Sequence, residues 1–498
     1  MATRMLRNIL GQGCKNINRK CCKRYLCSSR EAGGNADIPM KNVPLSSRPP
    51  NFPPPRYAVA DKTQHETQVT VLDNGLRVAS ENKFGEFCTV GVLIDSGSRY
   101  EVNYPSGINH FLEKLAFSKT TNYENRDKIN QVLEKVGGIC DCQSSRDTMI
   151  YAMSLEREGL PEALDILSDV VYQPVIGDEE IEMARQAIGF ELESLRMNPD
   201  PTALMVEMIF AAGYRNNTLG LPKICPAGNL SKIDNRLLYT YMNSYYDPKR
   251  VVLAGVGIDH DTLVNMAEKH FVTKSPIWTE NKSLIYPSKG MDCSIAQYTG
   301  GLVTEEQDLS DVSLGPNPMP ELAHLVIGLE SCSHRDDDFV TFCVLMNLLG
   351  GGGSFSAGGP GKGMYTRLYL NVLNKHHWIE MRRLQITLLP DTGMFLDKLT
   401  EVITKELVNT AGQTPQSYKE QLLVYAVDEL GHKFPVVFED CRAEKVTAED
   451  ISRVAQKMLR TKPAVAGYGT LQKLPDLDTI QNLILNKSKP KLFSLFGR

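Results

Sequence analysis

The stretch Arg250-Val-Val-Leu-Ala-Gly-Val-Gly257 is repeated, with changes, as Lys462-Pro-Ala-Val-Ala-Gly-Tyr-Gly469, at an offset of 212 positions (462 − 250). In both copies a short apolar run follows a segment with helical spacing, a pattern that predicts a buried strand after a helix. A second pair of similar segments, Asp95-Ser-Gly-Ser98 and Glu330-Ser-Cys-Ser333, has an offset of 235. Self-similarity at two places predicts two halves of one architecture that follow each other along the chain.

The two offsets differ, so the second copy is shorter than the first by 23 residues (235 − 212) between these landmarks. Strand and helix patterns are mixed in both halves, which predicts an α+β fold made of two homologous α/β domains, the second apparently shortened. At 498 residues and 42% apolar composition, the chain is long enough for two to four domains with substantial cores.

The charge is unevenly distributed. Residues 1–30 hold eight basic residues and no acidic one, which leaves 47 basic against 59 acidic residues in the rest of the chain, a balance near −12. In this head Arg4 and Arg7 lie among Met1, Met5, Leu6, Ile9 and Leu10, so a basic amphipathic helix is predicted. That composition is typical of a mitochondrial transit peptide and predicts a location in the matrix. A nucleic-acid-binding arm is the alternative, whereas a secretory signal would need an unbroken apolar core.

The composition also suggests domain boundaries. We expect the transit peptide over residues 1–30, a Pro/Gly-rich extended arm over 31–64, an N-terminal domain over 65–300, a linker over 301–320 and a C-terminal domain over 321–498. No apolar run approaches the roughly eighteen residues of a membrane-spanning helix. The eight cysteines after the head have no zinc-knuckle spacing and are predicted to be reduced thiols.

The sequence Gly350–Gly363, GGGGSFSAGGPGKG, contains eight glycines in fourteen residues. Ordering so many glycines costs backbone entropy, so a loop of this kind inside a domain is expected to be mobile or closely approached by a ligand. A phosphate-binding loop needs Ser or Thr after its lysine, but Lys362 is followed by Gly363. A mobile loop over a binding cavity is therefore preferred, with a disordered linker as the alternative.

A degenerate metal motif lies in the segment Gly107–Phe117. Its apolar residues recur at helical spacing, which brings His110, Glu113 and Lys114 together on a neighbouring face. In an inverted zincin the motif H-x-x-E-H supplies two zinc ligands and a glutamate that activates water. Here Lys114 stands at the fifth position, and a protonated lysine has no lone pair for a metal.

A candidate third ligand is Glu191, in the helical segment Asp178–Met197. It interrupts an apolar stripe that includes Ala184, Ala187 and Ile188, and a buried carboxylate needs a partner. We hypothesise that Lys114 supplies the positive charge that zinc would otherwise provide, so that an ion pair replaces a metal site. The alternative is an ordinary surface helix on which the histidine and the glutamate occur by coincidence.

The chain from about residue 55 onward resembles the pitrilysin-type metallopeptidase family. Within that family it resembles the non-catalytic alpha subunits of the heterodimers that process mitochondrial precursors. The resemblance is carried by His110-Phe-Leu-Glu-Lys114, by Glu191 after 76 intervening residues, by the two similar halves and above all by the glycine-rich stretch with its continuation to Trp378.

The resemblance implies that the chain is not itself an enzyme and holds no cofactor, and that a catalytic beta subunit carries the zinc. Its other implied partners are the presequences of precursor proteins and, peripherally, the inner membrane; no nucleic acid is expected. The implied substrate-binding residues belong to the glycine-rich loop: Gly350, Gly351, Gly352, Gly353, Ser354, Phe355, Gly358, Gly359, Pro360, Gly361, Lys362 and Gly363. The acidic body suits basic presequences through long-range attraction.

The chain departs from the family pattern after Trp378. There the family has a pair of strands, whereas Ile379–Phe395 leads almost directly into the helical segment Leu396–Lys405, and a further shortening is indicated near Phe438–Lys445. We therefore expect the second domain to lack a sheet strand. Two alternative functions are a structural core subunit of ubiquinol-cytochrome c reductase, which shares this architecture, and an active zinc peptidase, which Lys114 disfavours.

Overall fold

The computed structural model of the chain describes residues 67–82, 86–287, 290–309, 323–332, 336–350, 366–376, 379–382, 385–388, 446–472 and 474–488. All of them belong to one compact unit that begins at Gln64. The transit peptide and the extended arm expected over 1–30 and 31–64 lie outside these residues, as do residues 351–363 of the glycine-rich stretch. None of the helices in the described part combines the length and apolar character that a membrane span requires.

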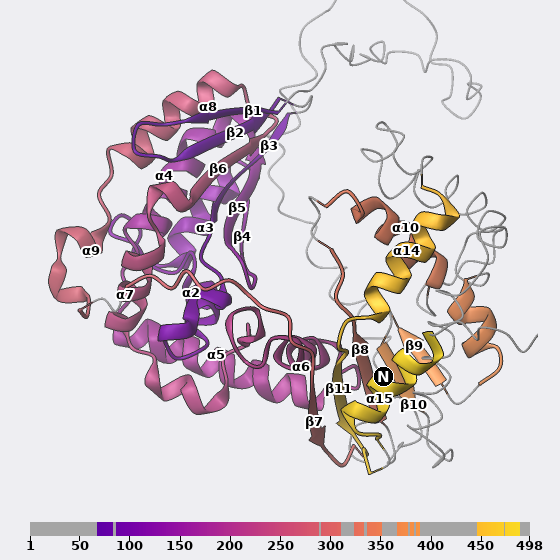
Figure 1. The fold of residues 1–498 in the computed structure, drawn as a ribbon. Coiled ribbons are helices and arrows are strands. Elements are labelled where there is room, and N and C mark those ends of the chain that lie inside the picture. The colour runs from indigo at the N-terminus through magenta and orange to yellow at the C-terminus, as the bar shows by residue number, and fades with distance from the viewer. Residues whose placement is uncertain are drawn as a thin grey trace, which may run out of the picture. The chain divides into compact units, whose positions relative to one another are not determined.

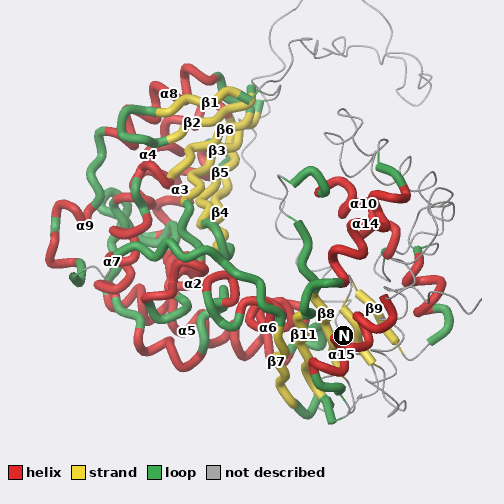
Figure 2. The backbone as a smooth tube through the Cα atoms, in the orientation of Figure 1, coloured by secondary structure: helices red, strands yellow, loops and turns green. Residues whose placement is uncertain are grey.

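The first sheet has six strands in the order β1-β2-β6-β3-β5-β4 (Figure 1). Their bounds are β1 Gln68–Val71, β2 Arg77–Glu81, β3 Phe87–Ile94, β4 Ile139–Ser144, β5 Met149–Glu156 and β6 Val251–Val256. Burial alternates along β3 and β5, so that one face of each strand lies in the core. The helices α3, α4, α7 and α8 lie on that side of the sheet (Figure 2).

Eight α-helices belong to the described part of the first half. They are α2 Ile108–Leu115, α3 Arg126–Lys135, α4 Leu160–Tyr172, α5 Asp178–Met197, α6 Thr202–Tyr214, α7 Asn235–Tyr245, α8 His260–Ala267 and α9 Ile277–Glu280. The observed bounds of α5 are those of the segment in which the sequence indicated helical periodicity.

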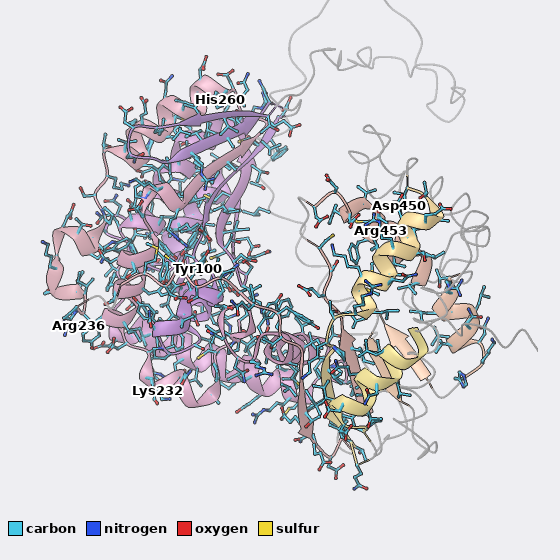
Figure 3. The ribbon with its side chains drawn as sticks, in the orientation of Figure 1. Tyr100, Lys232, Arg236, His260, Asp450 and Arg453 are labelled. Atoms are coloured by element: carbon cyan, nitrogen blue, oxygen red, sulfur yellow. The ribbon has the colours of Figure 1, made fainter. Side chains whose placement is uncertain are left out.

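The second sheet has five strands in the order β7-β11-β8-β10-β9. The strands and α-helices of this half are β7 Gly301–Glu306, β8 Ala323–Gly328, α10 Phe339–Leu349, β9 Ile379–Arg382, β10 Gln385–Leu388, α14 Ala448–Leu459, β11 Ala464–Gly469 and α15 Leu477–Ser488. Arg453 on α14, labelled in Figure 3, donates to both carboxylate oxygens of Asp338 at 2.7 and 2.8 Å, which ties α14 to the start of α10.

The registers of the two sheets confirm the predicted internal repeat. Each central strand, β6 or β11, pairs in parallel with one neighbour and antiparallel with the other. Val252 of β6 corresponds to Ala464 of β11, an offset of 212. In the first sheet, Val252 lies opposite Arg77 of its parallel neighbour β2 and opposite Leu93 of its antiparallel neighbour β3. In the second sheet, Ala464 lies opposite Gly301 of its parallel neighbour β7 and opposite Gly328 of its antiparallel neighbour β8. Leu93 of β3 and Gly328 of β8 therefore correspond at an offset of 235 (328 − 93), which is the second offset found in the sequence.

Two predictions about the second half need correction. The linker expected over 301–320 is wrong for Gly301–Glu306, which forms β7 and pairs along its whole length with β11. This edge strand is mostly exposed and ends in two glutamates, so its sequence lacks the apolar signal of a central strand.

The sheet strand predicted to be missing after Trp378 is not lost there, because β9 and β10 form and pair with each other, and β10 also pairs with β8. They are short, with four residues each against six in β4 and eight in β5. The strand without a counterpart among the described residues is β1, at the opposite edge of the sheet.

Each half of the chain has an apolar core next to its sheet. One apolar cluster lies between the first sheet and its helices, and a second surrounds α10, α14 and β11. Met205 and Met208 of α6 pack with Ala466 and Tyr468 of β11, so a helix of the first half contributes to the packing of the second sheet. The seven described cysteines are free thiols, as the sequence predicted for that part of the chain.

Candidate functional site

The start of α2 is fixed by close contacts around Gly107. Its φ of +115° favours glycine, and a Cβ atom there would lie 2.4 Å from the sulfur of Cys225. The buried carboxylate of Glu101 accepts hydrogen bonds from the backbone N–H groups of Gly107 (2.7 Å) and Asn109 (2.8 Å). Burial raises the pKa of Glu101 to about 7, although these hydrogen bonds act in the opposite direction. The helix that carries the degenerate motif is thus anchored at its first turn.

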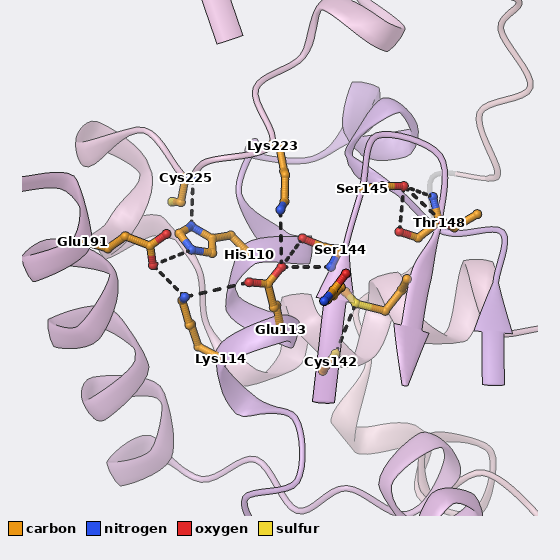
Figure 4. A network of polar contacts seen from close by, with 12 residues as sticks. His110, Glu113, Lys114, Cys142, Ser144, Ser145, Thr148, Glu191, Lys223 and Cys225 are labelled. Carbon is orange, nitrogen blue, oxygen red and sulfur yellow. Dashed lines mark hydrogen bonds and ion pairs between the residues drawn. The ribbon is translucent and has the colours of Figure 1, made fainter. Parts of the chain in front are cut away.

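Helix α5 packs against α2 and brings Glu191 to the motif (Figure 4). The Nζ atom of Lys114 lies 2.6 Å from Oε2 of Glu191, and Nε2 of His110 lies 3.3 Å from the same oxygen. The hypothesised ion pair between Lys114 and Glu191 is therefore present. The carboxylate expected to be buried is only partly so, because the Glu191 side chain is 37% exposed, and Ala187, assigned to the same stripe, faces solvent.

His110 is a buried, neutral hydrogen-bond donor in this arrangement. Its Nδ1 atom accepts the backbone N–H of Cys225 at 3.2 Å, so the ring proton resides on Nε2 and is donated to Glu191. Burial lowers the pKa of His110, and the nearby carboxylate of Glu191 offsets this only in part. The alternative of a surface helix with a coincidental histidine is wrong, because the His110 side chain is only 3% exposed.

The charge on Glu191 is stabilised by Lys114. Partial burial acts to raise the pKa of Glu191, but the hydrogen bond and positive charge of Lys114, together with His110, outweigh it and leave the pKa lowered. The carboxylate is therefore ionised at neutral pH, and the ammonium group beside it compensates its charge.

Glu113 is held by several partners. Its Oε2 atom accepts hydrogen bonds from the backbone N–H and the hydroxyl of Ser144 on β4, at 2.9 and 2.5 Å. The ammonium groups of Lys114 and Lys223 each lie 3.8 Å from one of its carboxylate oxygens (Figure 4). The glutamate that would activate water in an intact motif is thus engaged in hydrogen bonds and surrounded by cations.

The residues present do not fit a zinc ion. A catalytic zinc site needs three protein ligands with free electron pairs, and the motif offers His110 and Glu191 with an ammonium group between α2 and α5. In the ranges that the structure describes, no group of three or more His, Cys, Asp or Glu side chains is arranged to hold a metal ion. The arrangement joins two helices by charge and hydrogen bonds.

Three partners of the motif were not predicted from the sequence. Ser144 lies on an edge strand, whereas Lys223 and Cys225 lie in an irregular segment between α6 and α7. No periodic pattern marks these positions, and their contacts with α2 cross sequence separations of 31 to 115 residues. Only the chain's tertiary arrangement brings them to the site.

Of the predicted loop residues, the structure describes Gly350. It ends α10 with φ of +61°, and a Cβ atom there would lie 2.2 Å from the side chain of Thr366. Glycine is therefore required at this position for both conformational and steric reasons. The remaining predicted substrate-binding residues, 351–363, lie outside the described residues.

Family models match both halves of the chain. Residues 77–227 match the model described as insulinase, peptidase family M16, and residues 232–396 match the peptidase M16 inactive domain. The chain belongs to the M16 peptidase family, in agreement with the paired sheets and the degenerate motif on α2.

Individual relatives carry a narrower name. The mitochondrial-processing peptidase subunit alpha of Pongo abelii is 46% identical over 99% of this chain and 98% of its own length. The subunits of that name from Bos taurus and Caenorhabditis elegans are 49% and 37% identical, over 91% and 86% of this chain and 92% and 89% of their own. A protease from Helicobacter pylori has a similar fold, with a TM-score of 0.63 at 17% identity over 81% of this chain and all of its own.

Proposed function

We propose that this chain is the non-catalytic, substrate-recognising alpha subunit of a mitochondrial processing peptidase, which removes presequences from imported precursors in the matrix. A catalytic beta subunit would carry the zinc ion and the intact motif. Relatives that bear the name of this subunit over nearly their full length support the proposal.

The observation that carries the non-catalytic role is the contact between Lys114 and Glu191. The ammonium nitrogen lies 2.6 Å from a carboxylate that would otherwise be a metal ligand. Because Glu113 is also held by Ser144, neither a metal-bound water nor a free general base is provided by these residues. Hydrolysis would therefore depend on the partner subunit.

Charge supports the proposed substrate. The chain after its head has a balance near −12, whereas its own first thirty residues, an expected presequence, hold eight cations and no acid. Opposite charges of this kind raise the rate of encounter and favour basic peptides over acidic ones. In this proposal the glycine-rich stretch that begins at Gly350 contacts or admits the peptide.

The decisive test is reconstitution. The chain is mixed with a catalytic beta-type subunit, and the cleavage of a presequence peptide is measured for each subunit alone and for the pair. We expect cleavage to require the beta-type subunit and to accelerate when this chain is present. Turnover by this chain alone, abolished by a chelator and restored by zinc, would contradict the proposal. Co-purification with an inner-membrane respiratory complex would favour a structural core subunit instead.

A deletion tests the role of the loop. Removing Gly351 to Gly353 is expected to weaken precursor processing by the assembled pair while subunit association, measured by gel filtration, stays intact. Unchanged processing would mean that these glycines act only as a spacer.

A further inference from the structure

A cavity of about 510 Å³ lies next to the degenerate motif. Cys225, whose backbone N–H group binds His110, contributes to its wall. The rest of the wall is mainly apolar and comes from α5, α6, β7 and the segment between α6 and α7. The wall residues that matter here are Gly189, Leu192, Leu195, Leu204, Ile224 and Leu230.

Acidic side chains also line the cavity. Glu193 on α5 and Glu305 on β7 are exposed and form no ion pair with any described residue. Glu207 lines the cavity too, but its charge is compensated by Arg146 at 2.9 Å. Arg196 also lines the cavity, and among the described residues it forms no ion pair with these glutamates. An apolar hollow with uncompensated carboxylates is complementary to a peptide that combines apolar and basic side chains.

We infer that this cavity is a subsite for the presequence, in which an apolar side chain enters the hollow and a neighbouring Lys or Arg pairs with Glu193 or Glu305. The inference rests on the proposed function and specifies where the alpha subunit binds part of its substrate. A basic amphipathic segment presents this combination, because its apolar and basic residues alternate along one helix. The volume is sufficient for an apolar side chain of the size of leucine.

A single substitution can occupy part of the cavity without disturbing its wall. An added Cβ at Gly189 has no atom within 4 Å, and leucine is a better helix former than glycine. Gly189→Leu should therefore leave α5 intact and place a leucine side chain where an apolar side chain of the presequence would enter the cavity. Ala187→Leu is the matched control, since it places the same side chain on the exposed face of the same helix.

The experiment measures binding of a fluorescent peptide with the sequence of residues 1–30 of this chain. The full chain is assembled with a beta-type subunit whose general base is replaced, so that the peptide is bound and not cleaved. We expect Gly189→Leu to weaken binding about tenfold, the effect of excluding one leucine-sized side chain. Ala187→Leu should bind as the unaltered chain does. The pair Glu193→Gln and Glu305→Gln should weaken binding about two- to fivefold and reduce its salt dependence.

Each failure has a separate meaning. If Gly189→Leu binds the peptide as tightly as the unaltered complex does, the subsite is refuted and the proposed function stands. If the unaltered complex does not bind the peptide, the proposed function fails together with the subsite. A photoreactive residue in place of Leu204 provides a direct readout: cross-linking to the peptide supports the subsite. Cross-linking to residues 310–322 of the chain itself would overturn the inference by identifying an internal occupant.

Discussion

Two corresponding helices, α2 in the first half and α10 in the second, have opposite chemistry. At the offset of 235 that relates β3 to β8, the motif positions of α2 fall on three leucines of α10, each at most 2% exposed. The corresponding pairs are His110 and Leu345, Glu113 and Leu348, and Lys114 and Leu349. One half uses this position for a polar network, whereas the other uses it for its apolar core.

The difference shows what a polar group at this position requires. In the first half, α5, β4 and the segment between α6 and α7 each supply a hydrogen bond or an opposite charge to α2. In the second half, α10 packs against α14 within an apolar cluster and needs no such partners. Buried polar groups are stable only with partners, so the two helices could not exchange these residues without exchanging their surroundings.

The largest effect is expected when the polar chemistry is moved into the second half. Leu348→Glu would place a carboxylate without a partner in the core and should lower the free energy of unfolding by about 4 kcal/mol or more. Denaturant unfolding of the full chain measures it. Met346→Glu is the control on the same helix, because that side chain is 42% exposed, and it should change stability by less than about 0.5 kcal/mol. Similar losses for both variants would contradict the comparison.

Restoring the missing ligand should convert the first-half site into a metal centre. Lys114→His would add an imidazole one helical turn from His110 and free Glu191, giving three ligands. Zinc measured by mass spectrometry should rise toward one ion per chain, against none retained by the unaltered chain. Saturating zinc should stabilise the variant by about 3 kcal/mol at a hundredfold excess over the dissociation constant. No zinc in the variant would mean that α2 and α5 are not spaced for an ion.

Removing the cation tests how strongly it joins the two helices. Lys114→Met would leave Glu191 and Glu113 facing each other without a positive charge between them. Because Glu191 is 37% exposed, solvent screening should limit the loss to about 1 kcal/mol. A double-mutant cycle with Glu191→Gln measures the coupling, and a coupling energy near zero would show that the pair contributes nothing to stability.

The smallest effect is a pH dependence. The pKa of His110 is lowered in the folded chain, so below the ordinary value of 6.5 the unfolded chain takes up the proton more readily. The stability contribution of His110 is therefore present above pH 6.5 and is lost as pH falls through its folded pKa, with a slope of at most about 1.4 kcal/mol per pH unit. Unfolding measured between pH 7.5 and 5 should show a shallower slope for His110→Gln. An unchanged slope would mean that His110 does not titrate on unfolding.

Much of the fold and part of the site could be predicted from local patterns. Residue types and spacings within single elements are enough to predict the repeat at Val252 and Ala464 and the extent of α5. The pairing of Lys114 with Glu191 follows from one chemical requirement, that a buried carboxylate needs a partner. The edge strand β7 was missed, because it carries acids and has little apolar surface to bury. The short strands β9 and β10 were missed because four-residue strands give little alternation to detect.

The sequence by itself determined that the motif lacks a ligand, because a lysine ammonium has no free electron pair in any fold. It also determined the two-part architecture, since each half repeats the same pattern of strand and helix. Only the tertiary structure decided that Ser144 donates hydrogen bonds to Glu113 and that Nε2 of His110 donates one to Glu191. It also decided that a cavity lies beside these residues. These features depend on contacts between segments far apart in the chain, and no local pattern encodes such distances.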